Sequence, residues 1–77
     1  MTKKEYLEAK LACINKSKRA YIRDMKYNYI ILCGGNEPLC WSDGYAVVYG
    51  DKEDAEPDMA EGDILITEKE YYDSLDD

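Results

Sequence analysis

The chain changes its pattern at Tyr27-Asn28-Tyr29-Ile30-Ile31-Leu32-Cys33, a run that is rich in β-branched and aromatic residues. This composition favours a β-strand. The run is followed directly by Gly34-Gly35-Asn36-Glu37-Pro38, whose glycines and proline indicate a turn. Because apolar side chains alternate to both faces of the run, the sequence predicts a central strand that is buried on both sides.

Two further β-like runs follow this strand. Leu39-Cys40-Trp41 and Tyr45-Ala46-Val47-Val48-Tyr49 lie on either side of Ser42-Asp43-Gly44. An Asp-Gly pair between two such runs is typical of a tight hairpin. The sequence therefore predicts a three-stranded antiparallel meander over residues 27–49.

The residues before the meander have helical spacing. Thr2 and Glu5 are placed as in a capping box, in which each residue's side chain bonds the backbone of the other. Apolar residues then recur along one helical stripe, namely Leu7, Leu11, Ile14, Ile22 and Met25. The stripe is interrupted at Asn15-Arg19. We expect one helix that runs to about Met25, and the alternative is two helices separated at Asn15-Lys16-Ser17.

The residues after the meander predict a helix, a strand and a second helix. Asp51 or Asp54 can cap a short helix, and Pro57 requires this helix to be short or kinked at Glu56. Ile64-Leu65-Ile66 favours a short strand. Thr67 and Glu70 then repeat the capping spacing of Thr2 and Glu5, which predicts a C-terminal helix.

These elements together predict an α+β fold. The N-terminal helix packs on a small antiparallel β-meander, and a short helix, a short strand and a C-terminal helix follow. Seventy-seven residues have room for one core, so we expect residues 1–77 to form a single small acidic domain. No run approaches the roughly 18 apolar residues of a membrane span, and the first ten residues lack the apolar centre of a signal peptide. We therefore expect a cytoplasmic protein.

Residue types that commonly carry out chemistry are scarce. The chain has no His, which is the commonest general base and metal ligand. Cys33 and Cys40 are separated by six residues, unlike the two-residue spacing of redox and zinc motifs. We expect these two thiols and Cys13 to be free, buried and structural, and a bond between Cys33 and Cys40 across a hairpin stays open. The sequence thus predicts no catalytic residue, no metal, no cofactor and no enzymatic activity.

Charge is distributed unevenly along the chain, whose net charge is −7. Residues 1–26 contain eight Lys or Arg against three acidic residues, whereas residues 51–77 contain two Lys against twelve acidic residues. Seven carboxylates fall within thirteen residues, namely Asp51, Glu53, Asp54, Glu56, Asp58, Glu61 and Asp63. Such a segment is either a solvated helix face that keeps the domain soluble or a binding surface.

The binding interpretation gives our leading hypothesis for function. Carboxylates on a rigid surface can occupy the basic groove of a nucleic-acid-binding protein, whose Lys and Arg otherwise contact phosphates. The chain would then be a stoichiometric inhibitor and nucleic-acid mimic, the type of protein that phages and other mobile elements encode against host defences. The expected partner is a protein with a basic surface, and we expect no membrane and no direct nucleic acid. A competing interpretation is that the basic N-terminal helix packs near the acidic half and neutralises it.

A second class of function uses aromatic residues of the meander. Trp41, Tyr45 and Tyr49 would form a contact surface if they were exposed together. The chain would then be a protein-interaction module or a homodimer, bound through the Tyr- and Trp-rich sheet face. An acidic surface should lose its affinity as salt rises, whereas an apolar surface should not.

Overall fold

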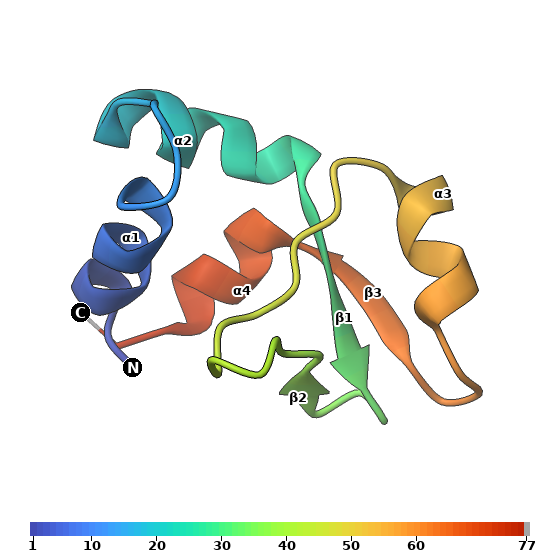
Figure 1. Cartoon of the computed structure of the whole chain (residues 1–77). Coiled ribbons are helices and arrows are strands. Elements are labelled where there is room, and N and C mark those ends of the chain that lie inside the picture. Colours follow the sequence, from blue (N-terminus) through green and yellow to red (C-terminus); the bar gives the residue numbers. More distant parts are fainter. Residues whose placement is uncertain (77) are drawn as a thin grey trace.

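Figure 1 shows the computed structural model, which describes residues 1–76 and confirms the predicted α+β class. The described chain forms four α-helices and a three-stranded antiparallel sheet. The helices are α1 (Lys3–Leu11), α2 (Lys18–Asp24), α3 (Lys52–Ala55) and α4 (Glu68–Ser74). The strands are β1 (Tyr29–Cys33), β2 (Glu37–Pro38) and β3 (Ile64–Thr67). Two 3-10 turns, η1 (Met25–Tyr27) and η2 (Glu56–Asp58), extend α2 and α3.

β1 is the central strand of the sheet, as its sequence predicts. The strand order is β2-β1-β3, and Ile30 and Ile31 of β1 are paired with Ile66 and Leu65 of β3, respectively. Ile30 and Ile31 point to opposite faces of the sheet and are both fully buried. The prediction of a strand that is covered on both sides is therefore confirmed.

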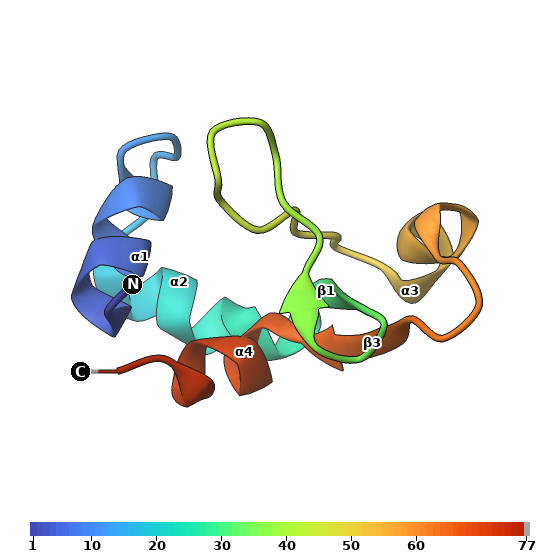
Figure 2. The same cartoon turned by 90° about the horizontal axis from the view of Figure 1, so that it is seen from below.

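The third strand of the sheet is β3, and not the run Tyr45–Tyr49 that we expected there. Residues 39–47 do form the predicted hairpin, because Trp41 N donates to Tyr45 O at 2.8 Å. This hairpin joins β1 mainly through its first residue, since Leu39 N donates to Ile31 O, and residues 45–49 return to β1 only at Tyr49. The hairpin follows β2 and precedes α3 in the sequence, and Figure 2 shows it rising away from the sheet. Beyond β2, this edge of β1 is therefore bonded only at Leu39 and at Tyr49 within residues 1–76.

The N-terminal segment forms two helices, so the expectation of one continuous helix is wrong. α1 ends at Leu11, and Ser17 begins α2 by accepting a hydrogen bond from Ala20 N. Because Ser is a strong N-cap residue, it starts a new helix where the apolar stripe is interrupted. The break lets α2 turn back, so that both helices can bury residues in one small core.

Most of the other local predictions agree with the structure. Thr2 and Glu5 form the capping box of α1, with Glu5 N donating to Thr2 Oγ1 at 3.1 Å. Thr67 accepts from Glu70 N at the start of α4. α3 is short and changes its geometry at Glu56, as Pro57 predicts, and the 3-10 turn η2 follows it. Asp51 occupies the N-cap position of α3, but its side chain forms no capping hydrogen bond.

The core lies where α1, α2 and α4 meet the central strand. Its buried members are Tyr6, Leu7, Tyr21, Met25, Ile30 and Ala46. In a chain without Phe, tyrosines supply the aromatic packing: the rings of Tyr6 and Tyr71 meet edge to face with centroids 5.7 Å apart. No helix within residues 1–76 is both long enough and apolar enough to cross a bilayer.

Candidate functional site

The seven predicted carboxylates lie on α3, η2 and the loop that leads to β3, at one end of the molecule (Figure 1). The segment is held to the rest of the fold by Ala55, which is fully buried, and by Lys52, whose Nζ lies 5.6 Å from the centre of the Tyr29 ring. A short, anchored helix therefore presents these side chains on a defined surface.

Two of the seven carboxylates have structural roles. Asp58 Oδ2 accepts a hydrogen bond of 2.6 Å from the hydroxyl of Tyr49, and burial together with this bond raises the pKa of Tyr49 to about 12. Asp63 accepts from the backbone N–H of Ala60 at 2.8 Å and of Gly34 at 3.0 Å, and these bonds hold its pKa below the usual range. Asp63 thereby joins the loop before β3 to the turn after β1.

The other five carboxylates are exposed, and we call them the acidic surface: Asp51, Glu53, Asp54, Glu56 and Glu61. Within residues 1–76, no Lys or Arg forms an ion pair with any of them. Their negative charge is therefore available to a partner.

The basic residues of α1 and α2 lie at the opposite end of the molecule. Figures 1 and 2 both place α1 and α2 at one end and α3 at the other, along an axis of 35 Å. Lys16 and Arg23 pair locally with Asp24, at 2.9 and 3.1 Å. The basic helices therefore do not neutralise the acidic surface, although α1 does pack against α4 of the acidic C-terminal half, where Lys3 N donates to Asp76 O. The competing interpretation of the sequence thus holds for α4 and not for α3.

Trp41 and Tyr45 come together, but Tyr49 does not join them. Trp41 has 60% of its surface exposed, and both it and Tyr45 line a cavity of about 410 Å³ between the 39–47 hairpin and α1. Tyr49 instead points to Asp58 of η2. The predicted aromatic set is thus divided between two places.

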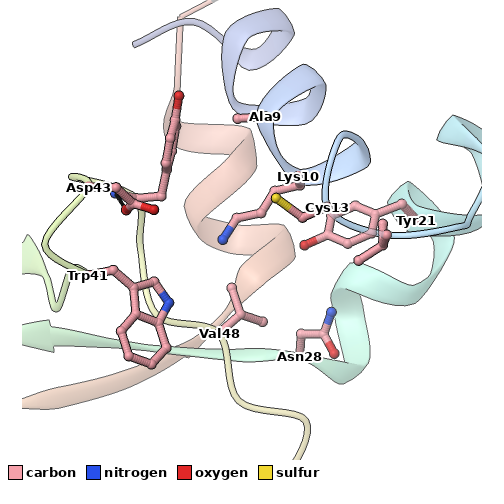
Figure 3. Close-up of a pocket in the computed structure, with 10 residues that line it drawn as sticks. Ala9, Lys10, Cys13, Tyr21, Asn28, Trp41, Asp43 and Val48 are labelled. Atoms are coloured by element: carbon pink, nitrogen blue, oxygen red, sulfur yellow. Dashed lines mark hydrogen bonds between the residues drawn. The ribbon is translucent and has the colours of Figure 1, made fainter.

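The cavity combines apolar walls with a few polar groups (Figure 3). Lys10 extends into it from α1, and Asp43 and Trp41 come from the tip of the hairpin. The remaining lining residues are Ala9, Cys13, Ile14, Tyr21, Asn28, Tyr45 and Val48. This mixture is typical of sites for small ligands, whose volumes begin at roughly 300 Å³.

Lys10 is held at the inner end of the cavity. Its Nζ donates to Ala46 O at 2.9 Å and lies 5.3 Å from the centre of the Tyr6 ring. Burial lowers the pKa of Lys10, while the nearby carboxyl groups of Glu68 and Asp43 act in the opposite direction. Lys10 thus lies near two carboxyl groups, but within residues 1–76 it forms an ion pair with neither of them.

A buried carboxyl group beside the cavity was not foreseen in the sequence. Glu68 has no exposed surface, and its Oε2 accepts from the hydroxyls of Tyr6 and Tyr21, both at 2.6 Å. Asn28 Nδ2 donates to Oε1 at 2.9 Å. Burial and the bonds to Glu68 raise the pKa of both tyrosines.

The spacing of the apolar residues in α4 indicates, from the sequence, that Glu68 is buried. Tyr71, Tyr72 and Leu75 pack against the core, and they follow Glu68 by three, four and seven residues. These positions share one face of a helix, so Glu68 lies on the apolar face of α4. An acidic residue on such a face predicts a buried polar cluster.

The three cysteines are free, as expected, but the expectation that they are buried is wrong. Cys13, Cys33 and Cys40 are all exposed, because each lies at or beyond the end of a regular element. In the part of the chain that the structure describes, no three Cys, Asp or Glu side chains are grouped as a metal site.

Comparison with protein-family models, with curated proteins and with solved structures gives no match to this chain.

Proposed function

We propose that this protein acts without catalysis, by binding a protein with a basic surface through its acidic surface. The partner that fits this chemistry best is a nucleic-acid-binding protein, whose Lys and Arg side chains normally contact phosphates. By occupying that surface, the chain is a stoichiometric inhibitor of nucleic-acid binding, as anti-defence proteins of phages and mobile elements are.

The separation of charge carries this proposal. A charged surface that only maintains solubility has no need to be kept away from the protein's own basic residues. Here the acidic surface and the basic helices lie at opposite ends of the molecule, and the acidic side chains are not paired within residues 1–76. This arrangement directs a negative field to one side, which increases the rate of association with a basic partner.

The test uses two variants of equal net charge. The first removes three carboxylates from the acidic surface, as Glu53→Gln, Asp54→Asn and Glu56→Gln. The second removes three exposed carboxylates from elsewhere, as Glu8→Gln, Glu37→Gln and Asp73→Asn. Wild type and both variants are used to capture proteins from host lysate at low and at moderate salt, and each captured protein is identified and assayed for nucleic-acid binding.

We expect the wild type and the second variant to capture a nucleic-acid-binding protein at low salt, and to inhibit it at a one-to-one ratio. The first variant should capture much less, and moderate salt should release the partner from all three. Equal capture by the two variants, or capture of proteins that still bind nucleic acid when complexed, would contradict the proposal.

The exposure of Trp41 favours a second candidate function. A Trp with 60% of its surface exposed beside Tyr45 is the kind of residue that anchors protein interfaces. In that case the chain binds a protein or a second copy of itself through the hairpin, and not through α3. Capture that persists at moderate salt and is lost in a Trp41→Ala variant would favour this candidate.

A further inference from the structure

The cavity between α1 and the 39–47 hairpin presents two opposite charges that do not pair with each other. Lys10 Nζ donates to Ala46 O, and Asp43 Oδ1 accepts from Tyr45 N at 2.9 Å. Within residues 1–76, neither side chain forms an ion pair with any other residue. An ammonium group has three donors and a carboxylate accepts several hydrogen bonds, so both groups have unused capacity toward the cavity.

The two charges restrict the ligands that fit. An anion that binds Lys10 is repelled by Asp43 and by the buried Glu68, whose oxygens are already bonded within the core, and a cation that binds Asp43 is repelled by Lys10. A ligand with one negative and one positive group close together satisfies both. The charges thus select a zwitterion over either single ion.

The rest of the cavity is suited to an apolar group. Trp41, Val48 and Ile14 line it from the hairpin, from the segment that follows the hairpin and from the loop between α1 and α2. Figure 3 shows the Trp41 ring and Val48 on the side of the cavity beyond the Lys10 ammonium group. A side chain that reaches from the charged groups across the cavity would cover these surfaces.

We propose that this cavity binds a free amino acid with an aromatic or aliphatic side chain. The α-carboxylate accepts hydrogen bonds from Lys10, the α-ammonium group donates to Asp43, and the side chain packs against Trp41 and Val48. This site is independent of the acidic surface on α3, and it holds whether or not the protein inhibits a nucleic-acid-binding partner.

The only Trp of the chain, Trp41, reports directly on this site. Its fluorescence is measured while L-phenylalanine or L-leucine is added to the full chain, up to about 10 mM, a range that covers weak affinities. N-acetyl-L-phenylalanine lacks the ammonium group and phenethylamine lacks the carboxylate, so these two compounds test each charge separately.

We expect a saturable change with at least one of the two amino acids, and affinities about tenfold weaker for both analogues. Lys10→Met and Asp43→Asn should each weaken binding about tenfold. The matched controls Lys26→Met and Asp54→Asn, which lie outside the cavity, should bind as the wild type does. Because Asp54 belongs to the acidic surface, Asp54→Asn alters the surface of the proposed function and leaves the cavity unchanged, so the two proposals are tested separately.

A second measurement does not depend on fluorescence. Cys13 lines the cavity, whereas Cys33 ends β1 outside it, and both thiols are exposed. The bound amino acid should slow alkylation of Cys13 by iodoacetamide and leave the rate at Cys33 unchanged. Asp43 is an exposed loop residue, so its variant remains informative if Lys10→Met does not fold.

The proposal is overturned by any of three results. The first is no saturable fluorescence change and no protection of Cys13 by either amino acid. The second is binding of N-acetyl-L-phenylalanine or phenethylamine as tightly as phenylalanine. The third is unchanged affinity in a folded Asp43→Asn variant.

Discussion

The side chain of Glu68 fixes three elements to the start of α4. Its two oxygens accept hydrogen bonds from Tyr6 of α1, from Tyr21 of α2 and from Asn28 next to β1. Its backbone N–H donates to Asn28 O at 2.8 Å. A buried carboxyl group is costly unless its oxygens are bonded, and here each oxygen has a donor. One residue thereby sets how α1, α2 and α4 meet.

We predict that Glu68→Gln lowers the free energy of unfolding by about 2–4 kcal/mol. The glutamine has one oxygen, and its amide nitrogen cannot accept from the phenols or from Asn28, so at least one buried donor loses its partner. Urea unfolding followed by circular dichroism measures the change. The control Glu8→Gln alters an exposed residue of α1 and should change stability by less than about 0.5 kcal/mol. Similar stabilities for the two variants would contradict this role of Glu68.

At the scale of elements, the 39–47 hairpin depends on its three-residue turn. Trp41 and Tyr45 pair across Ser42-Asp43-Gly44, and Gly44 N donates to Trp41 O at 2.9 Å. Gly44 has φ of 92°, a conformation that other residues adopt only with strain. The glycine therefore allows the hairpin to close and to place Asp43 beside the cavity.

We predict that Gly44→Ala destabilises the protein by about 1 kcal/mol and weakens ligand binding in the cavity. A Cβ at Gly44 meets nothing within 4 Å, so the cost comes from the backbone and not from a clash. Gly50→Ala is the matched control: its position is equally open and its φ is not positive, so the substitution should be neutral or slightly stabilising. Thermal unfolding of both variants tests this, and equal loss of stability would show that the turn geometry is not the cause.

Elements that depend on local signals could be predicted from the sequence. The caps at Thr2 and Thr67, the short helix before Pro57 and the Asp43-Gly44 hairpin all follow from residues within a few positions of each other. The pairing of β1 with β3 joins residues more than thirty positions apart, and the sequence offers two apolar runs as partners, Tyr45–Tyr49 and Ile64–Ile66. Periodicity alone does not decide between such partners.

Only part of the candidate site could be predicted, because many of its residues are distant from one another in the sequence. The exposure of the acidic surface follows from its composition, and its distance from the basic helices follows only from the tertiary fold. The cavity unites Lys10 of α1 with Asp43 of the hairpin, two residues with no common local pattern. The burial of Glu68 could be predicted from the helical spacing of α4. Its hydrogen-bond partners could not, because they come from three separate segments.

At the scale of the whole molecule, tyrosines link stability to alkaline pH. Burial raises the pKa of Tyr6, Tyr21, Tyr49 and Tyr71 above the ordinary value near 10. A group whose pKa is higher in the folded state favours folding below its unfolded pKa, and this contribution is lost as pH rises above that value. Ionisation of these phenols is therefore coupled to unfolding.

We predict that the protein is stable up to about pH 10 and unfolds cooperatively above it. The part of the tyrosinate absorbance that comes from Tyr6, Tyr21, Tyr49 and Tyr71 should then appear together with the loss of circular dichroism during an alkaline titration. Return to neutral pH serves as the control for chemical damage, because refolding should restore both spectra. Complete ionisation of all eight tyrosines in a chain that keeps its native spectrum would contradict the prediction.

The two ends of the described chain lie next to each other. Lys3 N donates to Asp76 O at 2.6 Å, and Thr2 and Asp76 form a parallel bridge. Both lie at the end of the molecule away from α3 (Figures 1 and 2). An affinity tag or a fusion partner would consequently extend from the same side of the molecule, whichever end of the described chain it is joined to. A chain immobilised through either end would therefore present α3 to the solution. A short peptide between the termini could also close the chain into a ring without disturbing the helices that it joins.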